Sequence, residues 1–237
     1  MKVLVIPDVH LKPFMFYGAD ILMKKGIAEQ VVCLMDIPDD WNQQYNVQLY
    51  EDTFDAAIDF AGKYPATLWC YGNHDLSYIW REYESGYSDI ASCLVRNKLK
   101  ELINVLPNEK QIQYIHLIDN VIFCHGGILD CFVEDIADLK QCNDMNAAIE
   151  RINALPQKQM WNDLSPIWSR PQYSKQKMYQ ANTLLQVVGH TPVEAITRSG
   201  NLISCDVFST YRDGRPIGTS QYLLLDTVTW NFSGVKP

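Results

Sequence analysis

The sequence predicts an α/β fold, in which parallel strands alternate with helices. Three short β-rich runs occur in the first part of the chain, namely "KVLVI" (2–6), "VVCLM" (31–35) and "ATLWCY" (66–71). Stretches of helical character separate these runs. The order strand, helix, strand, helix, strand is typical of a parallel sheet covered by helices.

The helical stretches are indicated by the spacing of their apolar residues. Between residues 47 and 64, apolar side chains recur three and four positions apart, and Pro65 predicts the end of the helix. Residues 14–30 are expected to be helical in part, because two glycines interrupt the pattern. Residues 89–102 predict a further helix.

The second half of the chain returns to strands. "IQYIHLIDNVIFCHGG" contains two β-rich runs around Asp119 and Asn120, which predicts a hairpin. Residues 131–180 are polar and helix-prone, and three β-rich stretches follow them, in "LQVVGHT", "EAITRSGNLISCD" and "QYLLLDTVTWNF". We therefore expect a single domain over residues 1–237 with a helix-rich segment at about 131–180, in which both halves contribute strands to a common core.

Composition limits the partners of the chain. Its 237 residues carry a formal net charge of -8, which disfavours general binding to nucleic acid or to an anionic membrane. An anionic substrate stays compatible, because metal ions can reverse the field at a site. No run approaches the roughly 20 apolar residues of a membrane span, and the apolar start before Pro7 is too short for a signal peptide.

The cysteines predict a cytoplasmic protein with reduced thiols. Their number is odd and no C-x-x-C pair occurs, which argues against a disulfide framework. Four of them lie in apolar, strand-like runs. The seven are Cys33, Cys70, Cys93, Cys124, Cys131, Cys142 and Cys205.

Five strand-like runs end in a short polar cluster. The clusters contain Asp8 and His10; Asp36, Asp39 and Asp40; Asn73, His74 and Asp75; His125; and His190. Binding sites of open α/β sheets form at the carboxyl ends of strands. Each cluster alone has an ordinary explanation as a turn or a cap, but five in succession favour a site. Of the five histidines, only His116 lies inside a strand-like run.

The donor atoms of these clusters predict a metal centre. Two Asp, one Asn and three His suit divalent Mn, Fe, Zn, Ni or Mg better than soft Cu(I). Six donors exceed the need of one catalytic ion, but they suit two ions that share a carboxylate about 3.5–4 Å apart and clamp a phosphoryl group. Asp8 and His10 are expected to share a face of an extended strand end.

The motifs together resemble the calcineurin-like metallophosphoesterases. The family pattern D-x-H, G-D-x-x-D, G-N-H-[DE], His before Gly or Ala, and G-H-x-[HP] corresponds here to "DVH", "MDIPD", "GNHD", "HGG" and "GHTP". The resemblance covers residues 8 to about 206. It implies a two-sheet β-sandwich flanked by helices, the four-layer αββα fold, with two divalent ions at the strand ends.

The resemblance also implies a role for each matching residue. Asp8 and His10 would bind the first metal, Asp36 would bridge, and Asn73, His125 and His190 would bind the second, with Asn73 also near the substrate. His74 would protonate the leaving oxygen, and Asp39 would hold its other nitrogen. A metal-bound hydroxide would attack phosphorus in line. Manganese is the expected metal.

Three departures from the family pattern affect the substrate. Met35 replaces a glycine, Asp39-Asp40-Trp41 replaces the D-R-G of the phosphatases, and the arginine before G-N-H is missing. "PIWSRP" resembles a W-x-R segment of bacterial members, so Arg170 is expected to form a bidentate contact with phosphate. "GHTP" favours the phosphoprotein-phosphatase and diadenosine-tetraphosphatase-like branch.

The sequence leaves several functions open. With one arginine and an acidic Asp40 near the mouth, a phosphodiester or a dinucleotide polyphosphate is an alternative to a phosphomonoester. A protein-binding scaffold without catalysis and a hydrolase of non-phosphate esters or amides are more remote alternatives. Trp41, Tyr71, Trp168 and Tyr173 are candidates for stacking on a base, although at least half of them are expected in the core. The oligomeric state stays open.

Overall fold

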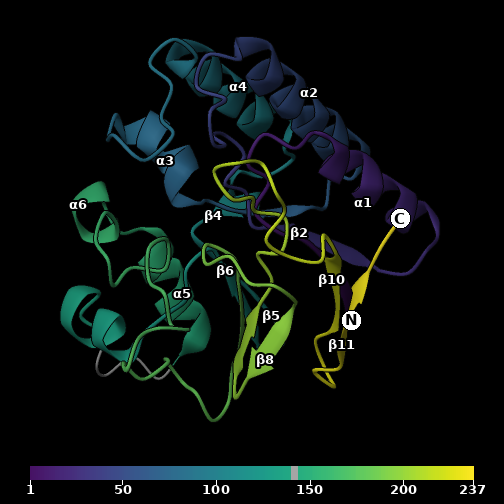
Figure 1. Ribbon diagram of the computed structural model, residues 1–237. Helices are drawn as coiled ribbons and strands as arrows, with labels where there is room; N and C mark the ends of the chain where they lie inside the picture. The colour runs from purple at the N-terminus through teal and green to yellow at the C-terminus, as the bar shows by residue number, and fades with distance from the viewer. Residues whose placement is uncertain (140–143) are drawn as a thin grey trace.

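The computed structural model describes residues 1–139 and 144–237 and contains two β-sheets packed face to face (Figure 1). The first sheet has the strand order β11-β10-β1-β2-β3-β4. Strands β1 to β4 are parallel to one another, and β10 pairs antiparallel with both β1 and β11. Its strands are β1 (Lys2–Ile6), β2 (Gln30–Cys33), β3 (Leu68–Cys70), β4 (Ile112–Gln113), β10 (Tyr222–Asp226) and β11 (Phe232–Val235). The predicted parallel α/β unit is thus confirmed.

The second sheet has the strand order β5-β6-β7-β9-β8, with β6, β7 and β9 parallel. Its strands are β5 (Ile115–Ile118), β6 (Val121–Cys124), β7 (Leu185–Val188), β8 (Thr197–Ser199) and β9 (Leu202–Ser204). The predicted hairpin is formed by β5 and β6, and Asp119 takes the left-handed conformation in its turn, with φ 53°. Strands from both halves of the chain therefore build the sandwich.

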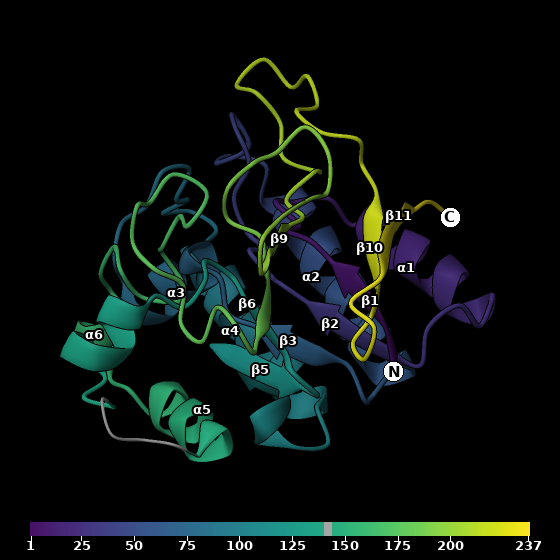
Figure 2. The ribbon, with the colours of Figure 1, turned by 90° about the horizontal axis from the view of Figure 1, so that it is seen from below.

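Helices cover both outer faces of this sandwich. Those on the first sheet are α1 (Phe14–Lys24), α2 (Val47–Lys63) and α4 (Ser92–Val105), and those on the second are α5 (Met145–Asn153) and α6 (Gln157–Met160). Figure 2 shows α5 and α6 separated from α1 and α2 by the sheets. The predicted helices are present, although the first ends at Lys24. The remaining helical elements described are α3 (Asn73–Trp80) and the single turns Glu109–Gln111 and Phe132–Ile136.

The alternation of side chains along each strand explains the layers. In β1, Leu4 and Ile6 pack under the helices, whereas Val3 and Val5 face the second sheet. The inter-sheet core contains residues from both sheets, among them Phe123 of β6. This arrangement agrees with the predicted two-sheet sandwich flanked by helices.

The segment 131–180 is helical only in its first part. Its helices end at Met160, and residues 161–180 form turns and irregular structure. Prolines at 166 and 171 interrupt any helix there, because proline lacks the backbone N–H that a helix needs. The six described cysteines are free thiols, as predicted, and Cys142 lies outside the described residues. No helix in the described ranges combines the length and apolar character of a membrane span.

His116 of β5, the histidine outside the polar clusters, is expected to make the fold sensitive to acid. It is buried, its Nε2 lies 3.0 Å from the carbonyl oxygen of Trp69, and burial lowers its pKa to about 4. The unfolded chain therefore takes up this proton first as the pH falls below about 6.5. The free energy of unfolding should fall by up to about 3 kcal/mol between pH 6.5 and 4 on this account.

His116→Asn should weaken this dependence on pH, although it costs some packing at pH 7. Urea unfolding of both proteins at pH 7 and pH 4.5 measures the effect. Parallel losses of stability in the two proteins would contradict it.

Candidate metal centre and active site

The polar clusters meet at one end of the sandwich. Asp8, Asp36 and Asn73 follow β1, β2 and β3 of the first sheet, and His125 and His190 follow β6 and β7 of the second. A cavity of about 330 Å³ opens there. The predicted residues that line it are His10, Asp36, Asp39, Asn73, His74, Arg170 and His190. Asp8 and His125 are fully buried.

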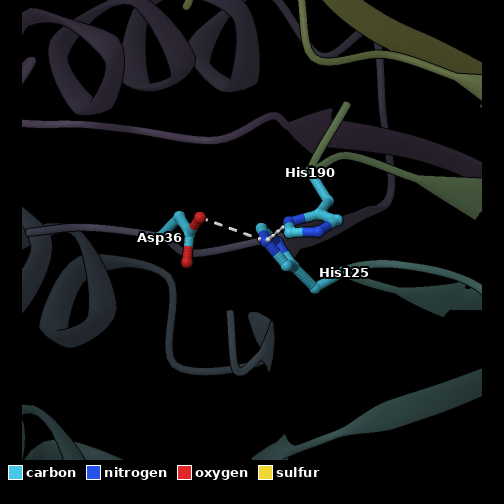
Figure 3. Close-up of side chains that lie close together, drawn as sticks. All are labelled: Asp36, His125 and His190. Atoms are coloured by element: carbon cyan, nitrogen blue, oxygen red, sulfur yellow. Dashed lines mark hydrogen bonds and ion pairs between the residues drawn. The ribbon is translucent and has the colours of Figure 1, made fainter. Parts of the chain in front are cut away.

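Four potential metal-ligand atoms converge at the ring of His125, its own Nε2 and three atoms of neighbouring side chains. Its Nε2 lies 3.1 Å from Oδ2 of Asp36, 3.1 Å from Nδ1 of His190 and 3.1 Å from Oδ1 of Asn73. Figure 3 shows Asp36 and His190 directed at this nitrogen. Asp36, His125 and His190 each offer one ligand atom, and these three atoms lie within 4.8 Å of one another. The three residues therefore form a candidate metal site.

A second candidate site shares one member with the first. Asp8, His10 and Asp36 also bring their ligand atoms within 4.8 Å of one another, and Nε2 of His10 lies 3.8 Å from Oδ2 of Asp36. The two groups together contain five of the six predicted ligands, and Asn73 adjoins the first group through His125. The shared residue is Asp36, the one expected to bridge.

The side chains fit divalent cations. Oδ1 of Asp8 and Nε2 of His190 are buried without a hydrogen-bond partner in the described part of the chain. Burial raises the pKa of Asp8 well above its usual value, and the charge of Asp206 raises it further. Burial also lowers the pKa of His190 well below its usual value, helped by His125. A bound cation would neutralise the buried carboxylate of Asp8 and would be coordinated by the neutral imidazole of His190.

The bridging position favours an ionised carboxylate. Burial opposes ionisation of Asp36, but the neighbouring His125 and His74 hold its pKa well below the usual value. Burial likewise opposes protonation of His125, yet Asp36 and Asp8 raise its pKa to about 9.

Left-handed backbone aims several of these side chains. His10, Asp36 and His190 have φ angles of 41°, 43° and 60°, a conformation that costs a non-glycine residue roughly 1–3 kcal/mol. The expectation that Asp8 and His10 share a face of an extended strand end is therefore wrong, because β1 stops at Ile6 and the chain turns before His10.

Met35 explains how the chain replaces the family glycine. It is buried and has φ 53°, so the backbone keeps the left-handed conformation that a glycine adopts easily. This turn also ends β2 at Cys33, two residues before the predicted end. Two other glycines are required for space, because a Cβ at Gly72 or Gly189 would collide with the carboxylate of Asp36 or Asp8, respectively.

Asp39 organises the second histidine of the cavity. Its Oδ2 lies 2.9 Å from Nδ1 of His74, and its Oδ1 accepts hydrogen bonds from the hydroxyls of Tyr50 and Tyr78 at 2.8 Å and 2.6 Å. Its carbonyl oxygen lies 2.9 Å from Nδ1 of His10. Burial opposes protonation of His74, but Asp36 and then Asp39 raise its pKa to about 9. Nε2 of a protonated His74 is thus available as a proton donor.

Asp75 is a site residue to which the sequence assigned no role. Its carboxylate accepts hydrogen bonds from the backbone N–H groups of Asp36, Ile37 and Gly72, at 2.9 Å, 3.1 Å and 3.0 Å. It therefore fixes the turn that carries the bridging residue against the start of α3. The signal was its place directly after Asn73 and His74, but its partners lie on another strand end.

Asp75→Asn should cost about 1–3 kcal/mol in the free energy of unfolding, because an amide nitrogen would face a backbone N–H donor in a buried position. Urea denaturation in EDTA, which excludes metal binding, measures the loss. Asp89→Asn, at an exposed position shortly after the same helix, serves as the control. A variant as stable as the parent would show that the three hydrogen bonds contribute nothing.

Arg170 lies at the cavity, as expected, but part of its guanidinium is already engaged. Its Nη1 donates to the carbonyl oxygen of His190 at 2.8 Å and to Oγ1 of Thr191 at 3.3 Å. The remaining N–H groups are available to a ligand. Asp40 does not leave a free negative charge at the mouth, because Lys12 donates to its Oδ2 at 2.9 Å.

Of the four aromatic residues considered for stacking on a base, two lie at the site and two lie away from it. Trp41 lines the cavity, and Trp168 contacts the ring of His190 edge-on at 5.7 Å between centroids. Tyr71 packs against Tyr114 away from the cavity, and Tyr173 is exposed outside it. Asp206, buried after β9 and lining the cavity, is a further site residue that the sequence did not single out, although it also follows a β-rich run.

The chain resembles known proteins in its family pattern and its fold. The chain matches the family model of calcineurin-like phosphoesterases over residues 1–213. The cold-active protein-tyrosine phosphatase of a psychrophilic Shewanella species aligns with a TM-score of 0.56 at 20% identity, over 98% of this chain and 80% of that one. This likeness supports the fold alone.

Two further solved structures align with lower scores. A metallophosphoesterase from Sphaerobacter thermophilus aligns over 100% of this chain and 88% of that one, with 16% identity and a TM-score of 0.46. A novel archaeal phosphodiesterase aligns over 100% of both chains, with 11% identity and a TM-score of 0.45. No curated protein matches the chain.

Proposed function

Because the chain belongs to the calcineurin-like phosphoesterase family, we propose that it hydrolyses phosphoester bonds with two divalent metal ions. The observation that carries this proposal is the pair of donor groups that share Asp36. The first ion would be held by Asp8, His10 and Asp36, and the second by Asp36, Asn73, His125 and His190. Their oxygen and imidazole donors support manganese, with Fe, Zn, Ni or Mg as alternatives.

Bound ions would supply positive charge that polarises the phosphoryl group and acidifies the attacking water. The side chains around them do the rest. His74 protonates the leaving oxygen through Nε2, while Asp39 accepts from Nδ1 and fixes the ring. Arg170 binds a phosphoryl oxygen with the N–H groups that His190 and Thr191 leave free. Asn73 lies at the cavity wall, where its amide would hold the second ion and contact the substrate.

The substrate class follows from the charge of the cavity. Two arginines, Arg170 and Arg212, and no lysine stand among its described lining residues, fewer permanent cations than a dianionic monoester usually meets. A phosphodiester or a dinucleotide polyphosphate is therefore the alternative to a phosphomonoester. The free thiols of the described cysteines support a cytoplasmic location.

Turnover of a panel of mono- and diesters by the Mn-loaded protein tests the proposal. We expect release of phosphate or of a phosphomonoester from at least one class. Hydrolysis of carboxylic esters or amides alone would identify a different hydrolase. Bound metal without any turnover would support a protein-binding scaffold instead.

A further inference from the structure

Arg212 stands at the cavity, and its guanidinium has no polar partner among residues 1–139 and 144–237. It lines the same cavity as His74, and its guanidinium carbon lies 4.8 Å from the centroid of the Trp41 ring. None of the described residues forms an ion pair or hydrogen bond with its guanidinium. A cation stacked on an aromatic ring keeps its edge N–H groups free, so Arg212 presents donors to a ligand.

The wall that carries Arg212 is fixed to the catalytic side of the cavity. Trp41 donates through Nε1 to the carbonyl oxygen of Thr210 at 3.0 Å, and Asn42 donates to the carbonyl oxygen of Arg212 at 2.9 Å. The hydroxyl of Thr210 also donates to Oδ1 of Asp40 at 3.0 Å. Figure 2 shows this segment, between β9 and β10, extending beyond the strand ends. Three hydrogen bonds thus hold the backbone at Thr210 and Arg212 against the segment 40–42 before any ligand arrives.

The surrounding charges leave this cation available to an anion. Asp40 directly precedes Trp41, and its carboxylate is paired with Lys12. Asp213 is paired with Arg215 through a 2.8 Å contact. Glu84, which also lines the cavity, interacts electrostatically with His74, so it does not neutralise Arg212, and an anion is favoured beside Arg212.

The position of Trp41 indicates which part of a substrate would meet Arg212. Trp41 follows Asp39 by two residues, and Asp39 holds His74, the proposed donor to the leaving oxygen. Arg170, by contrast, is attached to His190 beside the proposed ions. A leaving group protonated by His74 would therefore extend toward Trp41 and Arg212, and the phosphoryl group would lie beside Arg170.

We propose that Arg212, stacked on Trp41, forms a second anion subsite that binds a carboxylate or phosphate carried by the leaving group of the substrate. This inference rests on the proposed hydrolase function. It makes Arg212 a specificity-determining residue for anionic leaving groups.

The test uses two substrates of the same shape, 4-carboxyphenyl phosphate and 4-carbamoylphenyl phosphate, together with their methyl diesters. For whichever ester class the Mn-loaded protein turns over, kcat/KM should be about tenfold higher for the carboxylate. Arg212→Gln should remove this preference by lowering only the carboxylate value, and Arg212→Lys should restore part of it. Arg198→Gln, at an exposed position outside the cavity lining, should keep the preference.

A binding measurement separates this inference from the proposed function. Calorimetric titration of the Mn-loaded protein with 4-carboxybenzylphosphonate and 4-carbamoylbenzylphosphonate should show the same preference without turnover. Preference in binding with no hydrolysis would overturn the proposed function but keep the subsite. Equal values for both ligands in the parent protein, or equal losses for both in a folded Arg212→Gln variant, would overturn the subsite.

Discussion

Asp36→Asn is expected to remove at least one bound ion and to lower kcat by about 10³-fold or more, because loss of a metal ion removes several kcal/mol of transition-state stabilisation. Asp36 is the one residue in both candidate metal groups. Its Oδ2 faces His125 and His10, and its Oδ1 accepts the backbone N–H of His74 at 2.9 Å. Asparagine would place a neutral amide where two cations are proposed to share one charge.

Elemental analysis of the Mn-reconstituted variant, read together with kcat, checks this expectation. Asp55→Asn is a suitable control, since Asp55 is exposed and pairs with Lys98 on the helical face of the molecule. The control should retain both ions and full turnover. An Asp36→Asn protein with an undiminished metal content and rate would exclude a bridging role.

His74→Ala is expected to lower the rate by roughly 10²–10⁴-fold on a substrate with a poor leaving group. An alkoxide leaving group needs a proton, and His74 is the imidazole that Asp39 orients through Nδ1, while its Nε2 has no hydrogen-bond partner in the described part of the chain. A 4-nitrophenyl ester needs little protonation, so the same variant should lose much less activity on it. The ratio of kcat/KM for an alkyl and a 4-nitrophenyl ester measures the effect.

A uniform loss on both esters would point to a structural role for His74 rather than proton donation. Metal content should be unchanged in the variant, because His74 belongs to neither candidate metal group. This readout distinguishes a lost proton donor from a damaged metal centre.

Much of the site could be predicted because its residues follow strands directly. A polar residue after a short apolar run is a local signal, and parallel strands bring such ends together. Asp8, Asp36, Asn73, His125 and His190 are all of this kind. The roles that the resemblance assigns to them stay proposals, but the structure brings these residues together at one end of the sandwich.

Other residues could not be assigned because their meaning lies in contacts between distant segments. Asp75 acts on the turn after β2, and Lys12 neutralises Asp40 across 28 residues. Arg212 meets Trp41 across an even longer stretch of chain. Nothing in the local pattern around these side chains names the partner.

Backbone conformation was the other limit. An alternating pattern cannot show that β2 ends two residues before its predicted end or that the chain turns at His10, since both turns depend on non-glycine residues in the left-handed region, namely Met35 and His10. Such strain is stable only where surrounding hydrogen bonds fix it, as Asp75 does for Asp36.

The central claim is that six side chains from both sheets surround a pair of cations. Anomalous diffraction from crystals of the Mn-loaded protein tests it most directly. The account predicts two peaks about 3.5–4 Å apart, one beside Asp8, His10 and Asp36 and the other beside Asp36, Asn73, His125 and His190. A single peak, no peak, or peaks away from Asp36 would contradict it.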